Sequence, residues 1–98
     1  MALMLKTTTI KPSNTIFYGE QDPQSLGEFR EWQNHHKSVL GRHRKQIDEN
    51  TWEHIFIFEN QEELDKFKIE RDTINWHQEL VKYQTANNQS VTEEIISI

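Results

Sequence analysis

The sequence predicts a single α+β domain whose elements follow the order strand, helix, strand, strand, helix, strand. Three observations support this order: β-branched and aliphatic runs lie near both ends, two segments carry helix-start signals, and two extended runs flank a short polar segment. At 98 residues the chain has the usual size of one domain. We therefore expect residues 1–98 to share one core.

The first strand is predicted over residues 2–11, where three consecutive threonines (residues 7–9) favour extended backbone over helix. Pro12-Ser13-Asn14 interrupts it. The apolar residues 15–18 are expected either to continue the strand after a bend or to form a short second strand that ends at Gly19.

A helix is predicted from Asp22-Pro23, because the carboxylate can accept from free amides of the first turn and proline suits the first helical position. Apolar and polar residues with helical spacing follow, and Gly41 is the expected C-terminal stop. The members of this stripe are Leu26, Phe29, Gln33, His36 and Leu40.

Residues 42–47 and 52–58 flank a polar segment, 48–51, which predicts a β-hairpin with a four-residue connection. Alternation places two sets of side chains on opposite faces of the second arm. One set is Trp52, His54, Phe56 and Phe58, and the other is Glu53, Ile55, Ile57 and Glu59. Both faces are apolar at the centre, so we expect this strand to be covered on both sides.

A second helix is predicted from Asn60, which can cap its start while Glu63 reaches back. Its apolar residues form two stripes on nearly opposite sides, namely Leu64, Phe67, Ile74 and Val81, and Ile69, Trp76, Leu80 and Tyr83. Either the helix is covered twice, or it breaks near Asp72-Thr73 and Thr73 caps a new helix. In the first case Trp76 would pack on another subunit, and in the second it would turn inward. A turn at 87–90 precedes the last strand, 91–98.

The element order β-α-β-β-α-β is the ferredoxin-like arrangement, with two helices on one face of an antiparallel sheet. With its two-faced strand, the chain resembles the small dimeric α+β barrel proteins, in which two subunits pack sheet to sheet. That group includes cofactor-free monooxygenases, small-molecule-binding proteins and many members without a known activity. The resemblance implies a homodimer, and it transfers no catalytic residue.

Composition limits the possible partners and chemistry. The net charge of −5 opposes nonspecific binding to nucleic acid, and the absence of cysteine excludes thiolate catalysis and cysteine-ligated metals. The basic residues 42–45 are interpreted as a charged edge strand and not as an RNA-binding surface. No apolar run is long enough for a membrane span, so we expect neither nucleic acid nor membrane as a partner, no cofactor, and a cytoplasmic location by default.

The five histidines are His35, His36, His43, His54 and His77. No two on one helix are one turn apart, so no metal site is predicted, although His36 could meet His43. His54 is the candidate catalytic residue, because a neutral imidazole between aromatic neighbours could act as a general base or contact a ligand. The alternative is a histidine hydrogen-bonded inside a dimer core.

The function predicted first is a homodimer that binds an apolar small molecule in an aromatic-lined pocket. The candidate ligand-binding residues are Trp52, His54, Phe56 and Phe58. A cofactor-independent monooxygenase-like or isomerase-like enzyme that uses His54 is the first alternative. The second is a structural or regulatory interaction module. A cavity that contains His54 would favour the first two, and a filled interior would favour the third.

Overall fold

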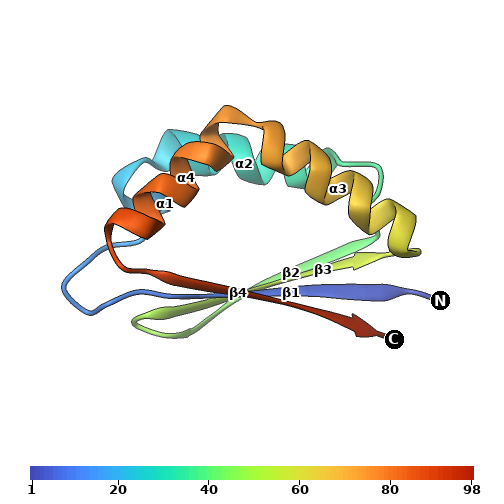
Figure 1. Cartoon of the computed structure of the whole chain (residues 1–98), viewed down its shortest axis with the longest axis horizontal. Coiled ribbons are helices and arrows are strands. Elements are labelled where there is room, and N and C mark those ends of the chain that lie inside the picture. Colours follow the sequence, from blue (N-terminus) through green and yellow to red (C-terminus); the bar gives the residue numbers. More distant parts are fainter.

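The computed structural model describes all residues, 1–98, as one antiparallel sheet with helices on one side (Figure 1). Its elements are β1 (Leu3–Ile10), α1 (Tyr18–Gln21), α2 (Pro23–His35), β2 (Gly41–Asp48), β3 (Thr51–Phe58), α3 (Gln61–Thr73), α4 (Asn75–Ala86) and β4 (Ser90–Ser97). The strand order is β2-β3-β1-β4, and every neighbouring pair is antiparallel. The predicted ferredoxin-like order is confirmed, with α1 and the α3–α4 break added to it.

The apolar core occupies one end of the space between sheet and helices. Leu5 of β1 lies opposite Phe56 of β3, and both face α3. Five side chains are buried there: Leu5, Phe56, Phe58, Leu64 and Phe67. Because the core ends near Phe56, the rest of the helix-facing side of the sheet is left for other contacts.

Helix α2 starts where the sequence predicts and ends earlier. Asp22 caps it, accepting from the Ser25 amide at 3.2 Å and from the Ser25 hydroxyl at 2.7 Å. The helix stops at His35, not at Gly41, because His36 is extended and its Nδ1 accepts from the Ser38 amide at 3.1 Å. The predicted stripe therefore loses His36 and Leu40, and Leu40 is 64% exposed.

Residues 15–18 form no strand, contrary to prediction. Thr15 closes a turn on the Pro12 carbonyl through its amide and its hydroxyl. The Ile16 carbonyl accepts from the side chains of Tyr83, at 2.7 Å, and Gln89, at 2.8 Å. Side-chain donors thus take the place of a neighbouring strand, and helix α1 follows at once, with Gly19 inside it.

The hairpin is confirmed, but its connection is Glu49-Asn50, two residues shorter than predicted. A bulge between Gln46 and Asp48 adjusts the register, and the Asp48 carboxylate accepts from the Asn50 amide at 2.8 Å. The basic residues 42–45 lie on β2, which is an edge strand as interpreted.

The second predicted helix breaks at Ile74, one residue beyond the expected position. Thr73 does not cap α4, because its hydroxyl donates to the Glu70 carbonyl at 2.8 Å, and the extended Ile74 leads into α4 without a side-chain cap. Asn60 caps α3 as predicted. Glu63 does not reach back, because its carboxylate accepts from the Ser38 hydroxyl at 2.6 Å.

No helix covers the second face of the sheet (Figure 1). Alternation brings Ile57, Met4 and Ile96 side by side on that face, across β3, β1 and β4. An ion pair between Lys6 and Glu53, at 3.4 Å, lies further along the same face. Within one chain β3 is therefore covered on one side only. No helix combines the length and apolar character needed to cross a membrane.

Candidate functional site

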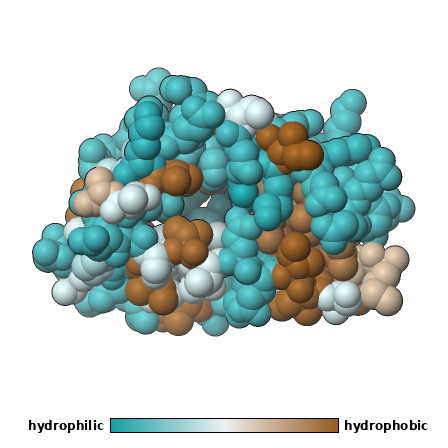
Figure 2. Space-filling model, in the orientation of Figure 1, coloured by the Kyte–Doolittle hydropathy of each residue, from teal (hydrophilic) through white to brown (hydrophobic).

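A cavity of about 700 Å³ lies between the sheet and the helices, next to the core. Figure 2 shows the surface hollowed in this region. Aromatic and aliphatic side chains form much of its wall: Phe17, Tyr18, Leu26, Phe29, Trp52, Trp76 and Leu80. The interior is therefore not completely filled, and the cavity contains His54, the candidate catalytic residue.

A row of polar side chains crosses the whole sheet below the cavity: Thr7, His54 and Glu93 line the cavity, and Arg44 lies next to His54, outside the lining. Strand register places Arg44 opposite His54, His54 opposite Thr7, and Thr7 opposite Glu93. All four project toward the helices, since they share a face with Leu5 and Phe56 by alternation. We call these four residues the polar belt. It lies two residues from the Phe56–Leu5 pair, and thus marks the end of the core.

The helices supply an aromatic roof. Trp76, at the start of α4, stacks on Phe29 of α2 with ring centroids 4.2 Å apart and approaches Trp32 at 6.0 Å. The break at Ile74 aims Trp76 inward, which is the second of the two predicted outcomes. Tyr83 also contacts its own chain, through the Ile16 carbonyl and the Tyr18 ring at 5.4 Å.

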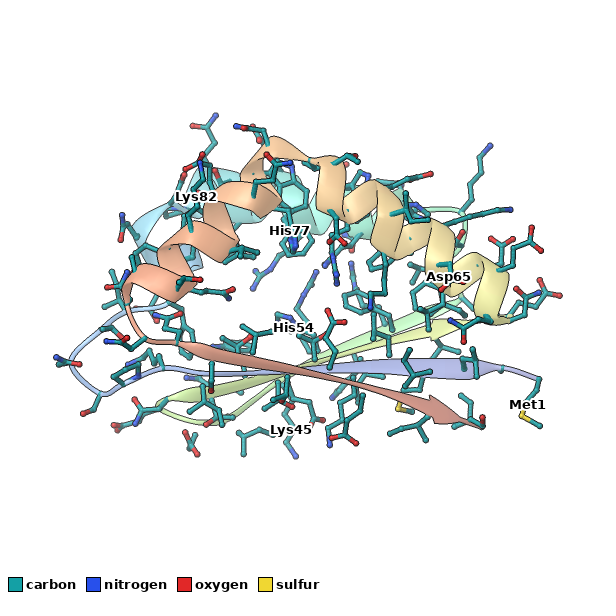
Figure 3. The ribbon with its side chains drawn as sticks, in the orientation of Figure 1. Met1, Lys45, His54, Asp65, His77 and Lys82 are labelled. Carbon is teal, nitrogen blue, oxygen red and sulfur yellow. The ribbon has the colours of Figure 1, made fainter.

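His54 is neutral at physiological pH. Burial and, to a lesser extent, the nearby positive charges of Arg44 and Arg30 together lower its pKa to about 4. Its ring lies 6.2 Å from that of Trp52. Figure 3 shows His54 pointing up from the sheet, while His77 points down from α4 toward the same space. A neutral imidazole here has a free lone pair that can accept a proton or a hydrogen bond.

Arg44 lies beside His54 at the β2 end of the polar belt. Its guanidinium donates to Gln33 Oε1, and Gln33 is only 2% exposed on α2. Burial, together with repulsion from Arg42 and Arg30, lowers the pKa of Arg44 to about 10, so the group remains cationic at neutral pH. Arg30, also on α2, lines the cavity.

The β4 end of the belt has balanced charges. Glu93 pairs with Arg71 at 3.1 Å and with Lys68 at 3.0 Å. Burial lowers the pKa of His77, whose Nε2 lies 3.5 Å from Asp72 Oδ1. His77 Nδ1 and Gln89 Oε1 are buried without a hydrogen-bond partner. Both residues line the cavity, but these two atoms themselves are buried within the protein.

Three of the four candidate ligand-binding residues line the cavity: Trp52, His54 and Phe56. Phe58 does not. It is fully buried in the core, with its ring 5.2 Å from that of Phe67, so we do not retain it as a ligand contact. Alternation placed all four residues on the face of β3 that the helices cover, but the length of that face covered by α3 depends on packing that alternation does not describe.

His36 and His43 do not meet. His36 Nε2 lies 2.6 Å from Glu70 Oε2, and its ring packs between Trp32 and Phe67. His43 is exposed on β2. No three histidine or acidic side chains are grouped as a metal ion would need.

Searches with the sequence found no matching family model and no matching curated protein. Solved structures do match. SnoaB, a cofactor-independent oxygenase from Streptomyces nogalater, has a TM-score of 0.66 at 3% identity, over 99% of this chain and 92% of that one. A dimeric ferredoxin-like protein of unknown function from Jannaschia matches with a TM-score of 0.61 at 10% identity, over 98% and 99% of the two chains.

Another matching structure is a dabb family protein with a ferredoxin-like fold from Mesorhizobium loti. Its TM-score is 0.57 at 11% identity, over 98% of this chain and 97% of that one. The chain has the ferredoxin-like fold. At these identities the likeness concerns the fold alone, and it agrees with the resemblance to dimeric α+β barrels.

The sequence did not indicate Arg30, Gln33, Trp76 and His77 as parts of one site. They come from two helices that meet only in the folded chain. One signal was present in the sequence: Arg44 and His54 lie on the two arms of the predicted hairpin. A hairpin without a bulge would set Lys45 opposite His54, so it is the bulge between Gln46 and Asp48, which the sequence did not predict, that brings Arg44 there.

Proposed function

We propose that the chain is a small-molecule-binding protein whose cavity takes a compact aromatic compound. The observation that supports this most is the cavity itself, with an aromatic roof above a polar floor. Its volume of about 700 Å³ lies within the usual range for ligand pockets, and a few polar groups in an apolar wall are typical of such sites. A module that only displays its surface has no need for such a space.

The proposal includes a homodimer formed through the uncovered face of the sheet. Support comes from the apolar row Ile57, Met4 and Ile96 on that face. The similar ferredoxin-like protein from Jannaschia is dimeric. A sheet-to-sheet dimer would leave the cavity of each subunit on its outer side, where a ligand can enter.

Binding can be tested with N-phenyl-1-naphthylamine, an uncharged aromatic probe whose fluorescence rises in apolar surroundings. We expect saturable binding at one site per chain. Thr7 lies at the middle of the polar belt and lines the cavity, so Thr7→Phe should fill the space and weaken binding about tenfold or more. Titration of both proteins at equal concentration measures the effect.

Thr8→Phe is the matched control. It makes the same chemical change at the next residue of β1, which projects to the uncovered face. Equal weakening in both variants, with folding intact by circular dichroism, would place the probe outside the cavity and refute the proposal.

A cofactor-independent oxygenase is the second candidate. Neutral, half-buried His54 could take a proton from an activated C–H bond of the substrate, and the resulting carbanion would then react with O₂ as co-substrate. The fold is shared with SnoaB, which is such an oxygenase. Oxygen uptake with aromatic substrates that form stabilised carbanions, lost in His54→Gln while the probe still binds, would distinguish enzyme from binding protein.

A further inference from the structure

We propose that the ligand is an organic anion whose negatively charged oxygens are held by Arg44 and Arg30, at the β2 end of the polar belt and next to His54. This inference rests on the proposed function of the cavity, and it specifies the chemical class of the ligand.

The first argument is that neither guanidinium has an acidic partner. The ion pairs of the chain involve Lys6, Lys66, Lys68, Arg71, Lys82 and three histidines, and they include neither Arg30 nor Arg44. Carboxylates are not scarce, since the chain has 16 acidic residues against 11 lysines and arginines. Lys11, Lys37, Arg42 and Lys45 also lack an acidic partner, but of the unpaired cations only Arg30 lines the cavity, and Arg44 lies next to the lining residue His54. Two unpaired arginines at this end of the cavity indicate a place for an external anion.

The second argument is energetic. Arg44 is partly buried, and burial with repulsion from Arg42 and Arg30 already disfavours its charged form. The neutral amide of Gln33 accepts one of its N–H bonds and orients the guanidinium without neutralising it. A buried charge without a counter-charge costs free energy, and an anion bound here would offset that cost.

The third argument is the polarity of the cavity. Its acidic residues are Glu20, Asp72 and Glu93. Glu93 is paired with Arg71 and Lys68, and Asp72 is paired with Arg71, while Glu20 is exposed at the rim. The β2 end alone therefore has uncompensated positive charge. An anionic group would bind there, with the aromatic part of the ligand under Phe29 and Trp76.

Two probes with the same ring system test this directly. 8-Anilinonaphthalene-1-sulfonate carries a sulfonate, and N-phenyl-1-naphthylamine is the same molecule without it. We expect the wild-type protein to bind the sulfonate about tenfold more tightly than the uncharged probe, as charge-assisted hydrogen bonds of ordinary strength would produce. Arg44→Gln should remove most of this preference and leave the affinity for the uncharged probe unchanged.

Lys45→Gln is the control. It removes the same charge from the adjacent residue of β2, which points away from the helices (Figure 3), so it should leave both affinities unchanged. Arg30→Gln is a second test variant in case Arg44→Gln unfolds. Arg30 is exposed on α2, and its loss should reduce the sulfonate preference without affecting folding.

The outcomes are distinct. The anion assignment would be overturned if the wild-type protein bound both probes equally, or if both arginine variants kept the preference for the sulfonate. Either result would leave the proposal of an aromatic ligand unaffected. The proposed function itself would be refuted if neither probe bound, or if Thr7→Phe left the affinity for the probes unchanged. The result that supports both proposals is weaker binding of both probes to Thr7→Phe, with the sulfonate preference reduced in the arginine variants and kept in Lys45→Gln.

Discussion

His54 shows how a single environment sets the chemistry of a residue. Two arginines and the surrounding side chains together disfavour its protonated form. The same arginines are placed to bind an anion. A bound anion would offset their effect and raise the pKa of His54, so binding and protonation at this site are coupled. A base that becomes stronger when an anionic substrate binds suits the oxygenase alternative.

The pKa of His54 also affects stability. It is about 4 in the folded chain against an ordinary value of 6.5, so between these pH values the unfolded chain binds a proton that the folded chain does not. The free energy of unfolding therefore falls as the pH drops from 6.5 toward 4. We expect a decrease of about 2 kcal/mol between pH 7 and pH 5 from this residue, by the linkage relation. Urea denaturation at the two pH values measures it.

His54→Gln should lose most of this pH dependence, and His77, whose pKa is also lowered, accounts for part of what remains. His35→Gln is the control, because the His35 side chain is largely exposed on α2. If both variants keep the full pH dependence, His54 is not buried as a neutral base.

At the scale of elements, the break at Ile74 resolves the two apolar stripes of residues 60–84. Leu64 and Phe67 of α3 pack on the sheet, and Trp76 of α4 packs on Phe29, so each stripe is divided between two helices with different directions. Ile69, counted with Trp76 in one stripe, is 67% exposed. The stripe pattern left two alternatives, a helix covered on both sides or a break near Asp72-Thr73, and the structure has the break, at Ile74.

Element types were more predictable than their ends. Helix starts were correct at Asp22 and Asn60, where a side chain forms a local cap. The end of α2 was wrong, because it depends on the hydrogen bond of His36 to Ser38 and not on a glycine. The prediction of a strand at 15–18 was wrong, because the side chains of Tyr83 and Gln89, far along the chain, donate hydrogen bonds to the Ile16 carbonyl. Local signals are visible in a sequence, and long-range partners are not.

Trp76→Ala tests the inward packing of α4. The loss of a large ring from the aromatic roof should lower the free energy of unfolding by about 2–4 kcal/mol, without changing the oligomeric state. Ile69→Ala, in the same predicted stripe but exposed, should cost less than about 0.5 kcal/mol. Thermal or urea denaturation, with light scattering on the same samples, measures both quantities. Dissociation of the oligomer without loss of subunit stability would instead place Trp76 at a subunit interface.

At the scale of the whole molecule, the structure differs in two directions: core and cavity follow each other along the strands, and a covered face and a bare face lie on opposite sides of the sheet. Along the strands, the core ends at Phe56 and Leu5, and the cavity begins at His54 and Thr7. Across the sheet, one face has the helices and the other has none (Figure 1). The element order predicted the bare face, and the alternation of β3 predicted that this face is apolar and needs a cover. It did not predict the division along the strands, which depends on where α3 ends and on the direction of α4.

The last prediction concerns that bare face. A core of only five fully or nearly buried apolar side chains is small for 98 residues, and burial of the row Ile57, Met4 and Ile96 against a second copy would add to it. Two-fold pairing of one face with itself is the commonest way to form a homodimer. We expect twice the chain mass of 11.8 kDa by light scattering at micromolar concentration.

Ile57→Lys should shift the protein to monomer, because it would bury a charge at the centre of the interface. Ile69→Lys, on the outer side of α3, should not. A wild-type protein that is monomeric and stably folded, or a dimer that tolerates Ile57→Lys, would mean that the sheet face is not the interface.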